Sequence, residues 1–244
     1  MKTYCHRGNA YGLNKIRENS ISNIEEVLVI GKGEIGVELD FQLYEGKLLC
    51  KHDRLPLITD KYLAKHREKI EKYGLFVSMD EIITTYGGRM PLLLELKTQL
   101  APKTLTGIIR TSGIKSYYEA LKEVLLKHID KTDISFMSYN LQLIEYCLRE
   151  FQGSGFRFGY LHHPFQTTAF ADVKPDFVCA NKLILLKASS VDYFRHRFGA
   201  ENTEVLAGCT GDNLPVLEKA IEAGVDAFMT NKIGNALQYT LQRN

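Results

Sequence analysis

Short apolar or β-branched runs recur along the 244-residue chain, and segments of helical periodicity separate most of them. Regular alternation of strands and helices is typical of a parallel sheet covered by helices. The runs cover residues 3–5, 35–43, 92–96, 134–137, 156–161, 177–179, 204–207 and 227–230. Eight such strands in a chain of this length predict a single closed (β/α)8 TIM barrel, of the α/β class. An open, doubly wound sheet is the structural alternative.

The segment after the first strand shows the helical pattern clearly. Asn19 or Ser20 can cap the start of a helix there, because either side chain can accept a hydrogen bond from a free backbone N–H. The residues expected on one side of that helix are Ile21, Ile24, Glu25, Leu28 and Val29.

The segment 55–88 interrupts the regular alternation. It contains a charged helical stretch at 60–72 and a second short helix at 79–86. We interpret it as a small insertion after the second strand, a reduced cap over the barrel mouth. The sequence has no internal repeat, low-complexity tract or linker rich in Pro and Gly, so we expect one domain over 1–244.

Composition excludes several classes of function. With 31 basic and 29 acidic residues, the net charge of +2 gives no electrostatic basis for binding nucleic acid or an anionic membrane. No apolar run approaches the roughly 18 residues of a transmembrane helix. The five cysteines form no CxxC pair, and Met1-Lys2-Thr3 leads directly into the first strand. We therefore expect reduced thiols, no signal peptide and a cytoplasmic protein.

Three carboxylates stand out at strand positions. Glu38 and Asp40 are two residues apart, so their side chains leave the same face of a strand, and Glu95 ends another apolar run. Two carboxylates about 5 Å apart repel by roughly 3 kcal/mol at an effective dielectric near 20. A hard divalent cation, Mg²⁺ or Ca²⁺, would relieve this repulsion. Pairing with Arg or Lys is the alternative, and a retaining glycosidase could also use two such carboxylates.

Two histidines follow strand-like runs near these carboxylates. His6 and His52 could divide acid/base work, one taking a proton from the nucleophile and the other protonating the leaving oxygen. Taken singly, a structural histidine is the simpler interpretation of each. Arg7 could grip a phosphate with two parallel hydrogen bonds, and Lys97 could act on it as a point charge. Each could instead be an ordinary ion-pair partner.

The ordered combination of these short motifs resembles the glycerophosphodiester phosphodiesterase family. The motifs are His6-Arg7-Gly8, Glu18-Asn19-Ser20, Glu38-Leu39-Asp40, His52-Asp53 and Glu95-Leu96-Lys97. The resemblance implies a (β/α)8 barrel in which Glu38, Asp40 and Glu95 bind one divalent cation. It also implies that His6 and His52 are the acid/base pair and that Arg7 and Lys97 contact the substrate phosphate.

The chain departs from the family pattern at several places. Arg17 precedes Glu-Asn where the family usually has Pro, and 55–59 differs from the family's Arg-Thr-Thr stretch. Residues 208–212 replace a Trp-Thr-Val-Asn run, and the chain has no Trp. The pocket therefore lacks a large apolar wall, and the short spacing between His52 and Glu95 leaves little room for a capping insertion. We expect a more open mouth, which could admit a lysolipid head group.

The function implied by the resemblance is metal-dependent hydrolysis of a glycerophosphodiester to an alcohol and glycerol 3-phosphate. One alternative is a lysophospholipase D or phosphodiester lyase that forms a cyclic phosphate. A more distant alternative is a non-catalytic barrel that binds a phosphate metabolite. The sequence leaves open Mg²⁺ against Ca²⁺, which histidine is the acid, the alcohol released and the oligomeric state.

Overall fold

The chain forms the closed barrel that the sequence predicted. A computed structural model describes residues 1–52, 60–98, 112–162, 174–181, 189–197, 203–208 and 211–241. Within these residues, eight parallel strands form a ring, because β1 pairs with both β2 and β9. The ring strands are β1 (Lys2–His6), β2 (Gly36–Tyr44), β4 (Leu92–Leu96), β5 (Ile134–Ser138), β6 (Arg157–His162), β7 (Phe177–Asn181), β8 (Glu204–Gly208) and β9 (Ala227–Thr230).

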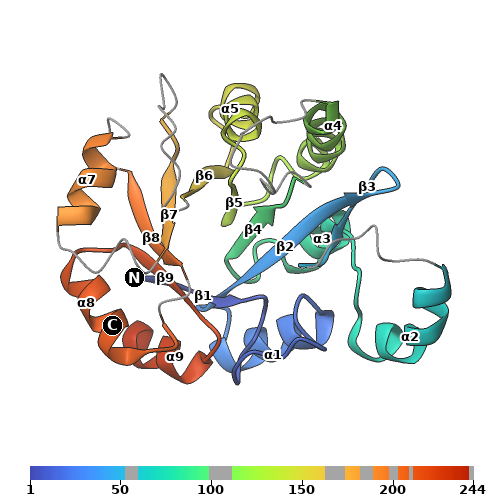
Figure 1. The fold of residues 1–244 in the computed structure, drawn as a ribbon, viewed down its shortest axis with the longest axis horizontal. Helices are drawn as coiled ribbons and strands as arrows, with labels where there is room; N and C mark the ends of the chain where they lie inside the picture. The colour runs from blue at the N-terminus through green and yellow to red at the C-terminus, as the bar shows by residue number, and fades with distance from the viewer. Residues whose placement is uncertain are drawn as a thin grey trace.

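Helices surround this ring (Figure 1). They are α1 (Ile21–Gly31), α2 (Asp60–Tyr73), α3 (Met79–Tyr86), α4 (Ser112–Lys127), α5 (Leu141–Glu150), α7 (Ser189–Arg197), α8 (Leu214–Glu222) and α9 (Ile233–Leu241). Ser20, rather than Asn19, caps α1 by accepting a hydrogen bond from the backbone N–H of Asn23. Ile24 is fully buried as expected, but Val29 is 73% exposed and lies outside the packed side of the helix.

The core has an inner and an outer part. Two large clusters pack strand residues against the helices, with Val37 and Leu39 of β2 among them. A third cluster consists of residues of the ring strands alone, including Tyr4, Leu93 and Met137. Because side chains alternate between the two faces of a strand, this third cluster fills the barrel interior. The carboxylates of β2 and β4 have the same parity as Leu93 and therefore face inward.

A short ninth strand, β3 (Lys47–Cys50), pairs antiparallel with β2 outside the ring. Glu45 and Gly46 join the two strands with positive φ values of 46° and 76°, as a two-residue type I′ turn requires. The sequence prediction did not include this hairpin. It also bears on the position of the chain beside the carboxylates, since the backbone N–H of Lys51 donates to the carbonyl oxygen of Asp40 at 2.8 Å. The hairpin thereby returns the chain to the carboxylates just before His52.

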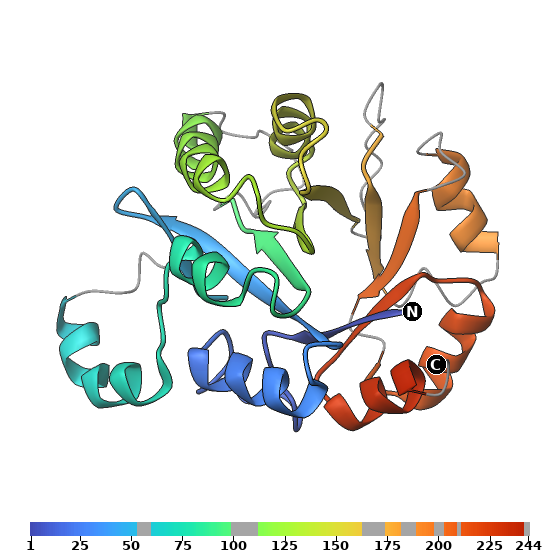
Figure 2. The same ribbon diagram turned by 180° about the vertical axis from the view of Figure 1, so that it is seen from behind.

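The insertion contains both predicted helices, α2 and α3. The α2 helix contacts α1, and both views place it at the outer side of the barrel, beyond α1 and α3 (Figures 1 and 2). Tyr62 and His66 of α2 line a pocket together with Glu18 and Lys51. Asp53 and residues 55–59 lie outside the described residues, as do residues 209–210.

Two predictions made from composition, on the cysteines and on transmembrane helices, can be compared with the structure. Cys5, Cys50, Cys147 and Cys179 are buried free thiols, as predicted, and Cys209 lies outside the described residues. None of the described helices combines the length and apolar character needed to cross a membrane.

Candidate functional site

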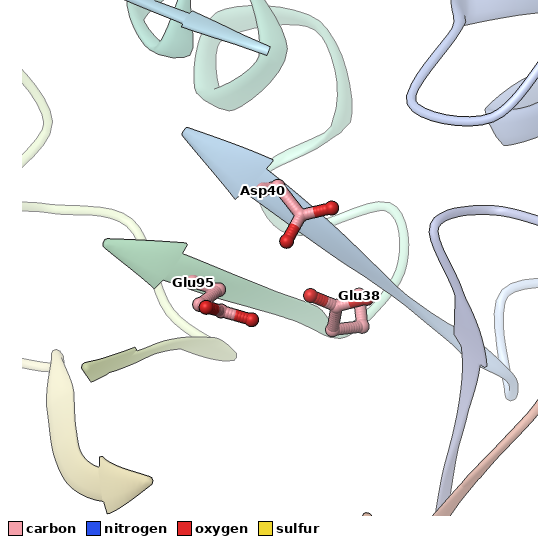
Figure 3. Close-up of side chains that lie close together, drawn as sticks. All are labelled: Glu38, Asp40 and Glu95. Atoms are coloured by element: carbon pink, nitrogen blue, oxygen red, sulfur yellow. The ribbon is translucent and has the colours of Figure 1, made fainter. Parts of the chain in front are cut away.

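The strand register brings the predicted site residues together. His6 of β1 lies opposite Glu38 of β2, and Asp40 of β2 lies opposite Glu95 of β4. His6 and Glu95 lie at or next to the carboxyl ends of β1 and β4, and the register places Glu38 and Asp40 of β2 level with them, at the end of the barrel where active sites form. Figure 3 shows the three carboxylates directed toward one another from β2 and β4. The structure thus assembles in space what the sequence distributes over 90 residues.

The carboxylate cluster has the chemistry of a cation site. Glu38, Asp40 and Glu95 are buried, and one oxygen from each lies within 4.8 Å of the other two. Ligands of Mg²⁺ and Ca²⁺ lie about 2.0–2.6 Å from the ion, so oxygens bound to one ion are separated by about 5 Å or less. Moreover, Glu38 Oε1 is buried, and no described residue forms a hydrogen bond with it. An unpaired buried carboxylate oxygen is costly, so these residues fit a hard divalent cation.

Two basic side chains partly neutralise the cluster. Lys97 Nζ lies 3.2 Å from Asp40 Oδ1 and 3.1 Å from Glu95 Oε1, and Arg7 Nε lies 3.4 Å from Asp40 Oδ2. The pairing with Arg and Lys that the sequence left open is therefore present for Asp40 and Glu95. Among the described residues, neither Lys nor Arg forms a side-chain ion pair with Glu38. This carboxylate instead accepts a hydrogen bond from the Arg7 backbone N–H at 3.0 Å.

That backbone contact depends on an unusual conformation. Arg7 has φ of 54° and Gly8 has φ of 68°, so both residues occupy the left-handed region. This region costs a non-glycine residue roughly 1–2 kcal/mol. The turn directs the Arg7 N–H at Glu38 while its guanidinium reaches Glu18, with Nη1 3.0 Å from Oε2. The strained turn thus serves to hold Arg7 beside the carboxylates.

Burial and mutual repulsion shift the pKa values of the three acids in different directions. Burial, together with Asp40 and Glu95, raises the pKa of Glu38 well above its ordinary value. Burial and Asp40 likewise raise the pKa of Glu95 to about 7. Burial would also raise the pKa of Asp40, but Lys97, His52 and Arg7 outweigh it and lower that pKa. Without a cation, the cluster therefore retains protons near neutral pH.

This proton retention predicts a pH-dependent stability in the metal-free protein. Relative to Glu95→Gln, the wild type is expected to lose free energy of unfolding as pH rises from about 4.5 to about 7. In this window the folded state binds more protons than the unfolded state, so raising the pH favours unfolding. The shift of Glu95 corresponds to at most about 3 kcal/mol. Asp40, whose pKa is lowered, contributes only at more acidic pH.

Urea unfolding of both proteins in EDTA across this pH range measures the difference. Saturating Ca²⁺ should abolish the loss of stability with rising pH in the wild type, because a bound cation favours the ionised carboxylates. A stability difference that is independent of pH in EDTA would contradict the protonation assigned to Glu95.

Both predicted histidines lie at the cluster. His6 Nε2 is 3.9 Å from Glu38 Oε2, and burial together with the charge of Arg7 lowers the pKa of His6. His52 lies at the end of the hairpin, where its backbone carbonyl accepts a hydrogen bond from Gln42 Nε2 at 3.0 Å. It is near enough that its charge lowers the pKa of both His6 and Asp40. Both imidazoles therefore interact electrostatically with this group of residues, and the His6 ring borders Glu38 directly.

Several supporting residues had no role in the sequence prediction. Asn19, which by sequence is a possible helix cap and part of the Glu18-Asn19-Ser20 motif but has no predicted role in the site, holds Asp40 at two points. Its Nδ2 donates to Asp40 Oδ2, and its Oδ1 accepts from the Asp40 N–H, both at 2.9 Å. Gln42 also donates to the Lys51 carbonyl at 2.8 Å. Gln42 occupies the same inward parity as Glu38 and Asp40, and this spacing was the one available sequence signal for it.

Solved structures resemble the whole chain. A glycerophosphodiester phosphodiesterase from Parabacteroides distasonis has a TM-score of 0.71 at 17% identity, covering 99% of this chain and 97% of that one. A phosphodiesterase from Oleispira antarctica in complex with the product sn-glycerol-3-phosphate has a TM-score of 0.69 at 19% identity, covering 99% and 97%. A glycerophosphodiester phosphodiesterase from Agrobacterium tumefaciens has a TM-score of 0.63 at 14% identity, covering 98% and 99%. The sequence matches neither a protein-family profile nor a curated protein.

These similarities extend over nearly the full length of both chains in each comparison. The protein therefore has the fold of glycerophosphodiester phosphodiesterases, as the motif resemblance implied. At this level of identity the comparison concerns the fold, whereas the chemistry has to be argued from the site itself.

Proposed function

We propose that this protein is a metal-dependent phosphodiesterase that hydrolyses a glycerophosphodiester to an alcohol and glycerol 3-phosphate. The observation that carries the proposal is the buried group of three carboxylates with an unpaired Glu38 oxygen, bordered by two imidazoles. The shared fold with phosphodiesterases, one of which binds sn-glycerol-3-phosphate, supports the same substrate class. It also favours phosphodiester hydrolysis over the glycosidase alternative.

Under this proposal, Glu38, Asp40 and Glu95 hold one divalent cation, Mg²⁺ or Ca²⁺. When bound, such an ion stabilises negative charge on phosphoryl oxygens and lowers the pKa of a coordinated water or hydroxyl. Asn19 keeps the Asp40 carboxylate in place through its two hydrogen bonds. The ion would also be a positively charged partner for Glu38 Oε1, which no described residue contacts through a hydrogen bond.

Differences in exposure support Arg7, Lys97 and His6 as the groups that contact the substrate. The side chains of Glu38 and Asp40 are 1% exposed, whereas those of His6 and Arg7 are 16% exposed and that of Lys97 is 23% exposed. An entering phosphodiester therefore meets basic side chains before it meets the acids. Arg7 and Lys97 would hold the non-bridging oxygens and stabilise the charge that builds on them.

His6 and His52 would carry the protons. One would accept the proton of the attacking hydroxyl, and the other would give a proton to the departing alcohol oxygen. The nucleophile could be water or a neighbouring hydroxyl of the substrate. Water gives an open phosphomonoester, whereas a substrate hydroxyl gives the cyclic phosphate of the lyase alternative.

A panel assay tests this function. The substrates are glycerophosphocholine, glycerophosphoethanolamine, glycerophosphoinositol and lysophosphatidylcholine, each with Mg²⁺ or Ca²⁺ and with ³¹P NMR detection of the product. We expect glycerol 3-phosphate from at least one glycerophosphodiester. If a folded, ion-binding protein gave no glycerol 3-phosphate in any reaction, the proposal would be overturned. A cyclic phosphate product would show that the enzyme is the lyase of the alternative rather than a hydrolase. Turnover of lysophosphatidylcholine would identify a lysolipid substrate.

A further inference from the structure

A chain of hydrogen bonds runs from His6 to a carboxylate outside the metal cluster. His6 Nδ1 lies 3.1 Å from Asn231 Oδ1, just beyond the end of β9. Asn231 Nδ2 donates to Asp212 Oδ2 at 2.7 Å, and the Asn231 backbone N–H donates to Asp212 Oδ1 at 2.5 Å. Asp212 also accepts from Thr230 Oγ1 at 3.0 Å. It belongs to the stretch 208–212 that the sequence marked as a departure from the family pattern.

The carboxylate determines which way the Asn231 amide points. A carboxylate only accepts hydrogen bonds, so the amide must turn its NH₂ group toward Asp212. Its oxygen then faces His6, where it also accepts from Asn9 Nδ2 at 3.3 Å. The reversed amide would place its oxygen against the Asp212 carboxylate and its NH₂ against the Asn9 donor. Two neighbours thus oppose the reversed orientation.

The amide orientation in turn determines the tautomer of His6. Asn231 Oδ1 is an acceptor, so Nδ1 of the imidazole must carry the hydrogen. In the neutral ring Nε2 is then unprotonated, and its lone pair lies on the side of Glu38, 3.9 Å from Oε2. A ring held in this form can accept a proton at Nε2 but cannot donate one from it.

We propose that Asp212 and Asn231 are positioning residues that fix His6 in the Nδ1–H tautomer and thereby make it the proton acceptor of the reaction. This inference rests on the proposed function. The proton of the attacking O–H passes to Nε2, and the electron pair left on oxygen forms the new bond to phosphorus. The imidazolium keeps its Nδ1–H bond to Asn231. The bond from phosphorus to the leaving oxygen breaks, that oxygen keeps the electron pair, and His52 has the complementary role of giving it a proton.

The test exchanges the two polar side chains. In Asp212→Asn the new amide keeps the bond from the Asn231 backbone N–H only by presenting its NH₂ to the NH₂ of Asn231, which favours reversal of the Asn231 amide. In Asn231→Asp two carboxylates would face each other. In the double variant Asp212→Asn/Asn231→Asp, the new amide at 212 donates to the new carboxylate at 231, which again accepts from His6. Thr230→Val is the matched control, since it removes one bond to Asp212 and leaves the chain to His6 intact.

We expect each single variant to lower kcat at least 10-fold with KM changed less than 3-fold, the double variant to recover most of the loss, and the control to stay near wild type. A histidine held in the wrong tautomer can cost up to about 10⁴-fold in kcat. A second measurement, ¹⁵N NMR of histidine-labelled protein, reports which ring nitrogen carries hydrogen, with His6 assigned from His6→Gln. The wild type and the double variant should show Nδ1–H, and Asp212→Asn should not.

An Nε2–H tautomer in the wild type would overturn the inference. So would a double variant that has the wild-type thermal stability but no recovered activity. The NMR measurement is independent of turnover, so it separates this inference from the proposed function. If NMR shows Nδ1–H but the protein cleaves no phosphodiester, the proposed function is wrong and the tautomer assignment is still correct.

Discussion

Replacing His6 or His52 by alanine is expected to lower kcat for a glycerophosphodiester by about 10²–10⁴-fold, the usual contribution of a positioned acid or base. Each imidazole borders the carboxylate cluster, and under the proposed function each transfers one proton in the same reaction. Because the two act as a unit, the double variant should lose little more activity than either single variant. Steady-state assays with the best substrate of the panel measure this.

The fold should survive both substitutions. The His6 side chain forms one hydrogen bond, to Asn231. Burial lowers the pKa of His6 and so favours the neutral ring. Its replacement therefore removes no ion pair on which the fold depends. His196 of α7 is exposed, and His196→Ala is the matched control that should keep full activity. Ion binding should also be unchanged in the two catalytic-site variants. Full activity in either of them would exclude that histidine from the chemistry.

The barrel could be predicted because its strands are buried on both faces. Runs such as Leu92–Leu96 are apolar throughout, except where a functional side chain replaces an apolar one at the carboxyl end. Regular spacing of such runs, with helices between them, is a strong signal in a single sequence. The same logic singled out Glu38, Asp40 and Glu95, since a charged side chain at an inward position of a strand is costly to bury unless it has a charged partner or binds a cation.

The supporting residues could not be predicted, because their contacts depend on how the barrel closes. His6 and Asn231 are 225 residues apart, and they meet only because β9 pairs with β1 to complete the ring. Asn is a residue type that often caps helices, but Ser20 caps this helix and the Asn19 side chain hydrogen-bonds to Asp40 instead. Local patterns specify elements, whereas these hydrogen bonds depend on tertiary register.

The β2–β3 hairpin had a local signal that was not used. Glu45-Gly46 between two apolar runs is a recognisable two-residue turn. A strand outside the ring adds nothing to the barrel pattern, so the search for eight alternating strands passes over it. Yet this strand brings His52 back to Asp40, which gives it a direct part in assembling the site.

The largest effect is expected from removing the cation. Exhaustive treatment with EDTA should abolish turnover, and Mg²⁺ or Ca²⁺ should restore it, because Lys97 and Arg7 neutralise the three buried carboxylates only in part and the proposed chemistry needs the ion at the phosphoryl oxygens. Glu38→Gln should have nearly the same effect on the ion-supplemented enzyme. It keeps the shape of the side chain but removes the charge of the carboxylate whose oxygen has no hydrogen-bond partner.

Thermal unfolding gives a readout of ion binding that does not depend on activity. A cation at 100 times its Kd adds about 2.7 kcal/mol to the free energy of unfolding, which for a chain of this size raises Tm by roughly 5–10 °C. Glu38→Gln should lose most of this rise, whereas Glu26→Gln, which removes an outer ion pair with Arg17, should keep it. Turnover that survives chelation, or an equal Tm rise in Glu38→Gln and the wild type, would count against a cation held by Glu38, Asp40 and Glu95.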